Sequence, residues 1–391
     1  MSFQEEDRKK LNIGIALNAL GKVAEATNGI YLFLARYLYG GVAFGLFAIT
    51  FSAIELMNRF LIGGFGDAMV YFSAKYSQRQ QDGDRLYVSL ASCLMVPLLL
   101  SLLLVAGLWG LAPWIQRSFW SQHDPEMVSL LRLLSLLLPL NLLLRLPIEA
   151  IKGQLNMKWA LIVTSTCHPL SNVALAVIFA VLGFGAHGLV WGQLVAQVFC
   201  IPLAWYGMFR FYSPARFFTA LFRLSCSRET LAFALPQSAN MMLNFGLVRI
   251  DTLMLSYWMD ANQVGTYTLV SEITRSIRGA KTSFSAVFAP LVAKYKALDN
   301  RSGIEHALHT VTSWTAALSI PIAYAVISFY PDIILGPGTP WEDSPFIVWF
   351  LATGPLLSCF FGLAGNLLLM SGHSLLLLYN SALITVLNIA L

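Results

Sequence analysis

Charged and amide side chains recur at helical spacing inside long apolar stretches of this 391-residue chain. In the first stretch the polar positions follow i, i+4, i+7 and i+10 spacing, which places them on one face of a helix. The same one-sided pattern returns three more times. The four polar stripes are Asn18, Lys22, Glu25 and Asn28; Ser52, Glu55, Arg59, Gly63 and Gly66; Gln237, Asn240, Asn244 and Asp251; and Glu272, Arg275, Gly279 and Ser283.

A charge at bilayer depth costs about 2.5 to 3.5 kcal/mol on insertion scales, so such groups usually face a bundle interior or a watery cavity. Several helices that each carry one polar stripe therefore indicate a water-filled lumen. A second interpretation is that Glu55 with Arg59, and Glu272 with Arg275, are self-compensating pairs that only hold the bundle together. The deepest charges, three of each sign, do not by themselves indicate a cationic cavity; they are Lys22, Glu25, Glu55, Arg59, Glu272 and Arg275.

The composition identifies the environment of these stripes. Hydrophobic residues make up 57% of the chain and charged residues only 12%, against about 25% charged in an ordinary soluble domain. The mean hydropathy is +0.67. Since a transmembrane helix needs about 20 mostly apolar residues, the sequence predicts an all-α polytopic membrane protein, with too little chain left over for a folded soluble catalytic domain.

Long apolar runs between charged or Pro/Gly-rich breaks predict about eleven spans. They cover residues 11–34, 43–66, 88–112, 128–149, 159–183, 188–209, 231–257, 264–287, 308–330 and 346–370, with an unfinished span from 374. With the N-terminus in the cytoplasm, sixteen of the 25 Lys and Arg residues fall on the cytoplasmic side. Only Arg36 and Arg117 fall on the opposite side. By the positive-inside rule this asymmetry predicts a cytoplasmic N-terminus, and the net charge of +5 then reflects topology and not binding of nucleic acid.

An internal repeat accompanies this topology. Gly45 and Gly265 are related by an offset of 220, Lys75 and Lys294 by 219, and the polar stripes of the second and eighth spans share that register. An offset of six spans predicts two parallel six-helix repeats, related by an axis along the membrane normal. A complete second repeat would end near residue 430, so we expect the chain to be a fragment or to lack its last helix and a half.

The predicted domains are an N-terminal six-helix lobe over 1–210, a cytoplasmic linker over 211–230 and an incomplete C-terminal lobe of five helices over 231–391. We expect no metal site. His306 and His309 lie at i, i+3 spacing beside Glu305 after a predicted loop, and a solvated helix face is the better interpretation of them.

Several segments resemble the polysaccharide-export flippases of the multidrug/oligosaccharidyl-lipid/polysaccharide exporter (MOP) superfamily. The resemblance covers essentially the whole chain, through loose sequence patterns. The segments that carry these patterns are residues 34–38 (LARYL), 44–47 (FGLF), 64–68 (GFGDA), 146–155 (LPIEAIKGQL), 183–190 (GFGAHGLV), 249–255 (RIDTLML) and 264–267 (VGTY).

The resemblance implies two six-helix lobes forming a V, alternating access, and translocation of an undecaprenyl-pyrophosphate-linked oligosaccharide across the bacterial inner membrane, for surface polysaccharides such as O-antigen. It implies no catalytic residue and no cofactor, because the substrate is moved and not transformed. Its partners would be the lipid-linked oligosaccharide, membrane lipid and polysaccharide polymerase or chain-length proteins. The lumen residues that match are Lys22, Arg59, Arg249, Arg275 and Arg278 for the pyrophosphate, with Asn18, Asn240 and Asn244 beside them. Four acids would carry coupling protons or pair with those cations, namely Glu25, Glu55, Asp251 and Glu272.

Two other functions stay open from the sequence. A cation- or proton-coupled multidrug antiporter of the same superfamily predicts a predominantly acidic lumen, which the even balance of charges disfavours. A membrane-embedded polyprenyl-sugar glycosyltransferase usually carries acidic motifs in large outer loops, and no predicted outer loop here exceeds about 15 residues.

Overall fold

A computed structural model describes residues 29–77, 83–119, 125–154, 156–223, 226–279, 281, 301–333, 346–361, 379 and 383–384. These residues form helices and turns, and no strand occurs among them. Six of the described helices are long and apolar enough to cross a membrane. The prediction of an all-α polytopic protein is therefore confirmed, while most of the first span and the eleventh span lie outside the described residues.

The chain divides into two compact units, residues 1–265 and 266–391. The first unit is a bundle, and its first described helix covers residues 29–39. The other helices of this unit are α2 (Gly41–Ser77), α3 (Gly83–Phe119), α4 (Pro125–Ser135), α5 (Leu137–Lys152), α6 (Lys158–Ala160), η2 (Leu161–Cys167), α7 (His168–Val181), α8 (Ala186–Phe209), α9 (Pro214–Phe222) and α10 (Arg228–Trp258). The division falls within α11 (Ala261–Arg275). The predicted lobe boundaries at 210 and 231 stay a prediction.

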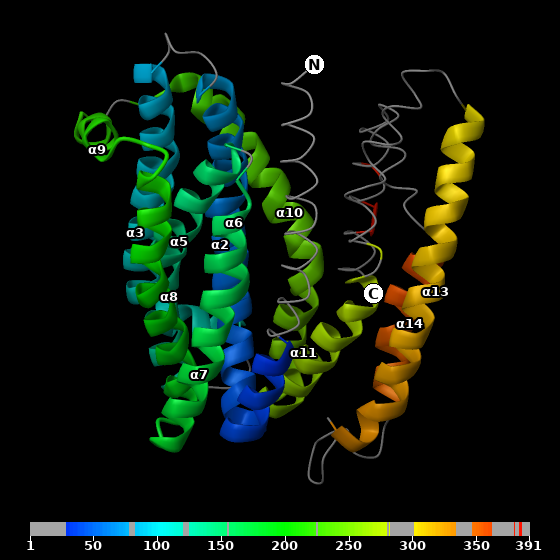
Figure 1. Cartoon of the computed structure of the whole chain (residues 1–391). Helices are drawn as coiled ribbons and strands as arrows, with labels where there is room; N and C mark the ends of the chain where they lie inside the picture. The colour runs from blue at the N-terminus through cyan, green and yellow to red at the C-terminus, as the bar shows by residue number, and fades with distance from the viewer. Residues whose placement is uncertain are drawn as a thin grey trace. The chain divides into compact units, whose positions relative to one another are not determined.

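The second unit contains the end of α11, the short helix η3 (Ser276–Arg278), α13 (Arg301–Ile333) and α14 (Phe346–Phe360). The helices α13 and α14 pack side by side (Figure 1). Their buried core joins Ile277, Ala323 and Ala352. The small alanine side chains let these helices approach closely, as is typical of helix pairs in membranes.

Several helices differ from the predicted spans. The second and third helices extend past the predicted spans, because α2 and α3 each run 37 residues. The fourth span is divided at Leu136 into α4 and α5, and the fifth contains the π-helical segment η2. Local adjustments of this kind are tolerated in membranes where neighbouring helices satisfy the freed backbone groups.

Buried amides hold the first unit together. Asn172 of α7 donates to Gln193 of α8 at 3.1 Å, and Gln197 of α8 donates to Asn141 of α5 at 2.9 Å. The indole of Trp205 donates to the carbonyl of Leu143 at 3.0 Å. Hydrogen bonds between helices of this kind contribute about 0.6 kcal/mol each on average, so this network fixes which helix faces meet.

Among the described helices of the first unit, α2 and α10 form the most extensive contact. The rings of Tyr71 and Phe233 stack at 5.2 Å between centroids. At the end of α2, Lys75 forms an ion pair of 2.6 Å with Glu229 in the first turn of α10. The hydrogen bonds from Lys75 and Tyr76 lower the pKa of the Glu229 carboxyl. Since its pKa is lower in the folded state, this pair stabilises the fold at neutral pH and is lost as the pH falls through that pKa.

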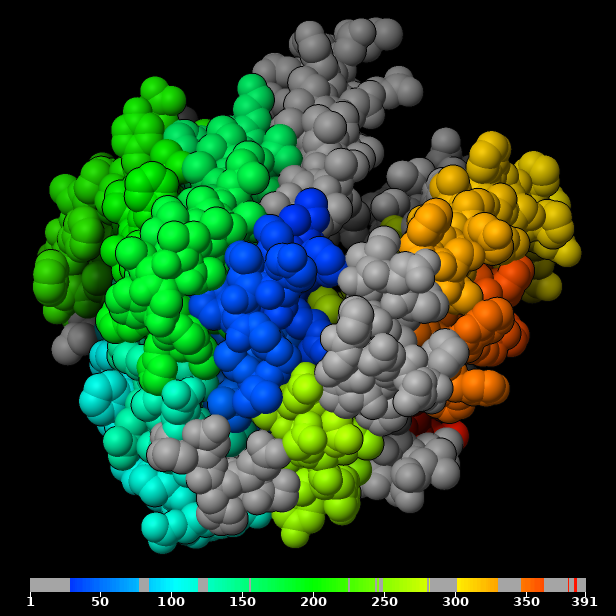
Figure 2. Space-filling model, turned by 90° about the horizontal axis from the view of Figure 1, so that it is seen from below, coloured from blue at the N-terminus to red at the C-terminus, as the bar shows by residue number. Residues whose placement is uncertain are grey.

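Glycine permits the close approach of α2 to its neighbours. A Cβ added at Gly64 would overlap the carbonyl oxygen of Ala234 and the backbone of Ser238 in α10. A Cβ at Gly45 would overlap the carbonyl oxygen of Ala261, where α11 begins, and a Cβ at Gly265 would lie 2.9 Å from the Cα of Gly45. Figure 2 shows the beginning of α2, in blue, against the connection between α10 and α11, in yellow-green. The two glycines that the repeat pairs by an offset of 220 are therefore in contact.

We expect Gly64→Ala to lower the stability of the protein in detergent by about 2 kcal/mol, because the added methyl group overpacks the interface between α2 and α10. The midpoint of thermal unfolding would fall on the order of 5 °C. Gly110→Ala in α3 is the matched control, since a Cβ there meets nothing within 4 Å and a helical alanine is favoured over glycine. Equal midpoints for the two variants would contradict the packing argument.

Candidate functional site

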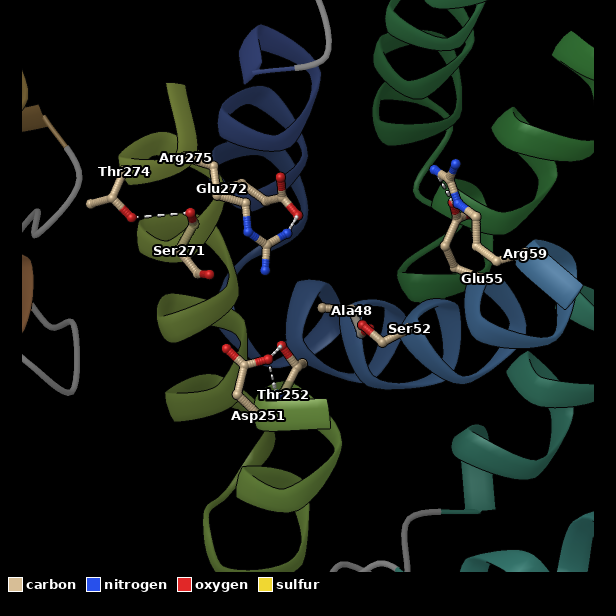
Figure 3. A network of polar contacts seen from close by, with 10 residues as sticks. All are labelled: Ala48, Ser52, Glu55, Arg59, Asp251, Thr252, Ser271, Glu272, Thr274 and Arg275. Atoms are coloured by element: carbon tan, nitrogen blue, oxygen red, sulfur yellow. Dashed lines mark hydrogen bonds and ion pairs between the residues drawn. The ribbon is translucent and has the colours of Figure 1, made fainter. Parts of the chain in front are cut away.

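The polar face of α2 carries an ion pair at its centre. Arg59 donates from Nη2 to Oε1 of Glu55 at 3.0 Å and from Nε to the same oxygen at 3.1 Å (Figure 3). The pair follows from i, i+4 spacing on one helix. The side chain of Arg59 is 45% exposed and that of Glu55 17%. The guanidinium group is therefore accessible to a ligand while the carboxylate orients it.

The ring of Phe245 in α10 forms cation-π contacts with two arginines. The Cζ atom of Arg59 lies 4.4 Å from the ring centroid, and that of Arg249 lies 5.9 Å from it. Stacking on an aromatic face stabilises a guanidinium group without consuming its hydrogen-bond donors. Two adjacent helices thus present guanidinium groups at one ring, an arrangement that suits an anion with several oxygen atoms.

Two further polar contacts continue this face along the same helices. Gln237 of α10 donates to Oδ2 of Asp67 in α2 at 2.8 Å. Further along α10, Asp251 accepts a hydrogen bond of 2.7 Å from the backbone N–H of Thr252 (Figure 3). The hydroxyl of Ser52 instead donates to the carbonyl of Ala48 within α2. The carboxylates of Asp67 and Asp251 are therefore both engaged by donors of this unit.

The second unit has a polar face of its own. Arg275 donates to Glu272 at 2.8 Å, with side chains about one fifth exposed (Figure 3). Directly after this pair the helix tightens into η3, which contains the exposed Arg278. Lys281 donates to the carbonyl and hydroxyl oxygens of Ser358 in α14, at 2.9 and 2.8 Å. A 3₁₀ segment within a span often marks a functional position.

The structure brings only part of the predicted site together. Glu55, Arg59 and Arg249 meet around Phe245. Asn240 is exposed on α10, and Asn244 lies on α10 although its side chain is not described. Asn18, Lys22 and Glu25 lie outside the described residues. The roles assigned to all of these residues stay predictions.

Phe245 was missed by sequence reasoning, which followed polar residues only. The sequence contains a pattern that predicts its contact with Arg249, because the two residues are separated by four positions and therefore share a helix face. The partner from α2 could not have been found in this way, because it requires the packing of two helices.

Comparison with solved structures shows the transporter fold of the MOP superfamily. An outward-facing multidrug resistance MATE family transporter matches with a TM-score of 0.60 and 18% identity, covering 94% of this chain and 84% of the other. A eukaryotic MATE transporter matches with a TM-score of 0.61 and 17% identity, covering 95% and 82%. A MOP superfamily transporter from Pyrococcus furiosus matches with a TM-score of 0.55 and 17% identity, covering 95% and 83%.

The family is defined by sequence. Residues 33–343 match the model of a family described as "Polysaccharide biosynthesis protein", and the chain belongs to this family. A comparison with curated protein sequences finds no match. The chain is thus a multi-pass α-helical protein of a polysaccharide biosynthesis family with the fold of the MOP superfamily transporters, and the predicted family is confirmed.

The shared ring predicts an energetic coupling between Phe245 and Arg59. In a double-mutant cycle with Phe245→Leu and Arg59→Gln, we expect a coupling of about 0.5 to 1 kcal/mol in the free energy of unfolding, as for a partly exposed cation-π pair. Chemical denaturation of the purified protein in detergent measures it. Phe199→Leu in α8 serves as the control, because this exposed ring has no cation-π contact in the described part of the chain. Additivity of Phe245→Leu with Arg59→Gln would contradict the contact.

Proposed function

We propose that this protein translocates an undecaprenyl-pyrophosphate-linked oligosaccharide across the bacterial inner membrane by alternating access, for the synthesis of surface polysaccharide. The observation that carries the proposal is the pair of guanidinium groups at Phe245, in a chain that belongs to a polysaccharide biosynthesis family. Such a transporter is not an enzyme, because its substrate is moved and not transformed.

The pyrophosphate is the part of this substrate that the site suits best. A diphosphate presents several anionic oxygen atoms, and guanidinium groups bind phosphate through paired N–H donors. Arg59 has accessible surface despite its bond to Glu55. In this proposal Lys22, Arg275 and Arg278 add positive charge along the path, and the amides Asn18, Asn240 and Asn244 bind sugar hydroxyl groups.

The acids then divide between two roles. Glu55 and Glu272 each bond an arginine of their own helix, which supports pairing as their role. Coupling by proton transfer needs a carboxylate that changes its protonation during the cycle, and we assign Asp251 and Glu25 as the candidates for that step.

The same proposal implies the orientation of the protein in the membrane and its partners. The N-terminus lies in the cytoplasm, where lipid-linked repeat units are assembled, and the outer face delivers them to polymerase and chain-length proteins. Membrane lipid surrounds the transporter, and nucleic acid plays no part.

A deletion strain complemented with variants tests the proposed function. We expect strains carrying Arg59→Gln or Arg249→Gln to accumulate undecaprenyl-linked repeat units and to lose surface polymer, by roughly tenfold for the double variant, which corresponds to about 1.4 kcal/mol of lost binding. Mass spectrometry of extracted lipids and quantification of surface polysaccharide give the two readouts.

The control is Arg117→Gln, which removes an exposed arginine at the end of α3 and should support normal polymer levels at equal expression. Unchanged lipid-linked pools in the deletion strain, together with increased sensitivity to cationic drugs, would contradict flipping and favour the multidrug antiporter.

A further inference from the structure

The segment between α8 and α10 folds into a separate helix at one end of the bundle. Helix α9 lies across the direction of α3 and α8 (Figure 1). Ser213 has an extended backbone, and Pro214 opens the helix, so the chain turns sharply before α9 begins. The helix packs against α3, and the hydroxyl of Tyr87 in α3 accepts a hydrogen bond of 2.9 Å from the backbone N–H of Ser213.

One face of α9 anchors it to the bundle. Phe217 is fully buried, and its ring meets that of Trp205 in α8 edge to face at 5.7 Å. Ala220 is buried on the same side, one turn further on. These contacts fix the rotation of the helix, so the remaining positions have defined directions.

The other positions of α9 divide into an apolar and a basic sector. Phe218 is 40% exposed, with its ring also stacked on that of Trp205 at 6.3 Å, and Phe222, on the same side four residues further on, is 80% exposed. Arg216, within the helix, and Arg223, which follows its last residue, are exposed as well. At 3.6 residues per turn the two arginines are roughly 100 to 160° from the two phenylalanines. A helix that lies in a membrane surface has this division, with rings toward the acyl chains and cations toward the headgroups.

The charged residues of this stretch of sequence are all basic. No Asp or Glu occurs between Glu149 and Glu229, whereas Arg210 lies at the end of α8, directly before α9. The exposed guanidinium of Arg210 lies 5.5 Å from the ring centroid of Tyr206. Three arginines with no acid in this stretch of sequence complement an anionic surface, and a lipid surface is the one found at the end of two membrane-spanning helices.

We propose that α9 is a docking site for anionic phospholipid headgroups at the membrane surface, with Arg210, Arg216 and Arg223 binding the lipid phosphates while Phe218 and Phe222 insert beside the acyl chains. This proposal does not depend on which substrate the transporter moves. It makes the segment between α8 and α10 a membrane-bound element.

Native mass spectrometry of the full chain in detergent tests the proposal with dioctanoyl phosphatidylglycerol and dioctanoyl phosphatidylcholine. We expect the phosphatidylglycerol to bind about tenfold more tightly than the phosphatidylcholine. Arg216→Gln with Arg223→Gln should remove most of that preference, whereas Arg117→Gln with Arg301→Gln, the same charge change at exposed arginines of α3 and α13, should keep it. Equal binding of both lipids by the unchanged protein, or an undiminished preference in the α9 variant, would overturn the proposal.

A photo-crosslinking residue introduced at the exposed position of Thr219 identifies the occupant in cells. The adduct expected is a phospholipid, seen as a small increase in mass. A protein adduct at this position would overturn the lipid assignment and identify a protein partner in its place. Size-exclusion chromatography of each variant confirms folding, and none of the substituted side chains belongs to the buried core.

Discussion

The close approach of α2 to α10 is the constraint on which the described site depends. Gly64 allows the backbone of α10 to lie directly against α2, and Gly45 allows the same where α11 begins. Helices in lipid associate through close packing and hydrogen bonds between helices, because there is no difference in hydrophobicity between the lipid and the apolar side chains. The same helix pair carries Arg59, Phe245 and the contact between Asp67 and Gln237. A change in the spacing of these two helices would therefore separate Arg59 from the ring that it shares with Arg249.

The cost of charge in a membrane explains the arrangement of the polar groups. An arginine in the bilayer is tolerated when it faces a cavity or a compensating partner. Both conditions hold for Arg59, which is bonded to Glu55 and nearly half exposed. A water-filled lumen and pairing within the helix are alternatives in the sequence, yet the geometry of Arg59 is compatible with both at once. A guanidinium group that is bonded to a carboxylate but still accessible can donate hydrogen bonds to a ligand. When the ligand dissociates, the carboxylate still compensates its charge.

The spacing of residues along the sequence predicted the features that depend on a single helix. The spacing of Glu55 with Arg59 and of Glu272 with Arg275 indicated both ion pairs as one of two interpretations, and the apolar runs predicted most of the described helices. The offset of 220 paired Gly45 with Gly265 as equivalent positions. Their mutual contact was not predictable, because periodicity within a helix says nothing of which face meets which neighbour. For the same reason Phe245 was missed, and the linker predicted over 211–230 contains the helix α9, whose amphipathic pattern is too short to distinguish from a loop.

Transport of the lipid-linked diphosphate in a purified system tests the central claim most directly. Proteoliposomes would be loaded with an undecaprenyl-pyrophosphate oligosaccharide in the inner leaflet, and an external glycosidase would report the fraction of sugar that reaches the outer leaflet. The account predicts transfer that requires the protein, is slowed by Arg59→Gln with Arg249→Gln, and is unaffected by Arg117→Gln. Transfer no faster than in protein-free vesicles, or transfer indifferent to the two arginines at Phe245, would contradict it.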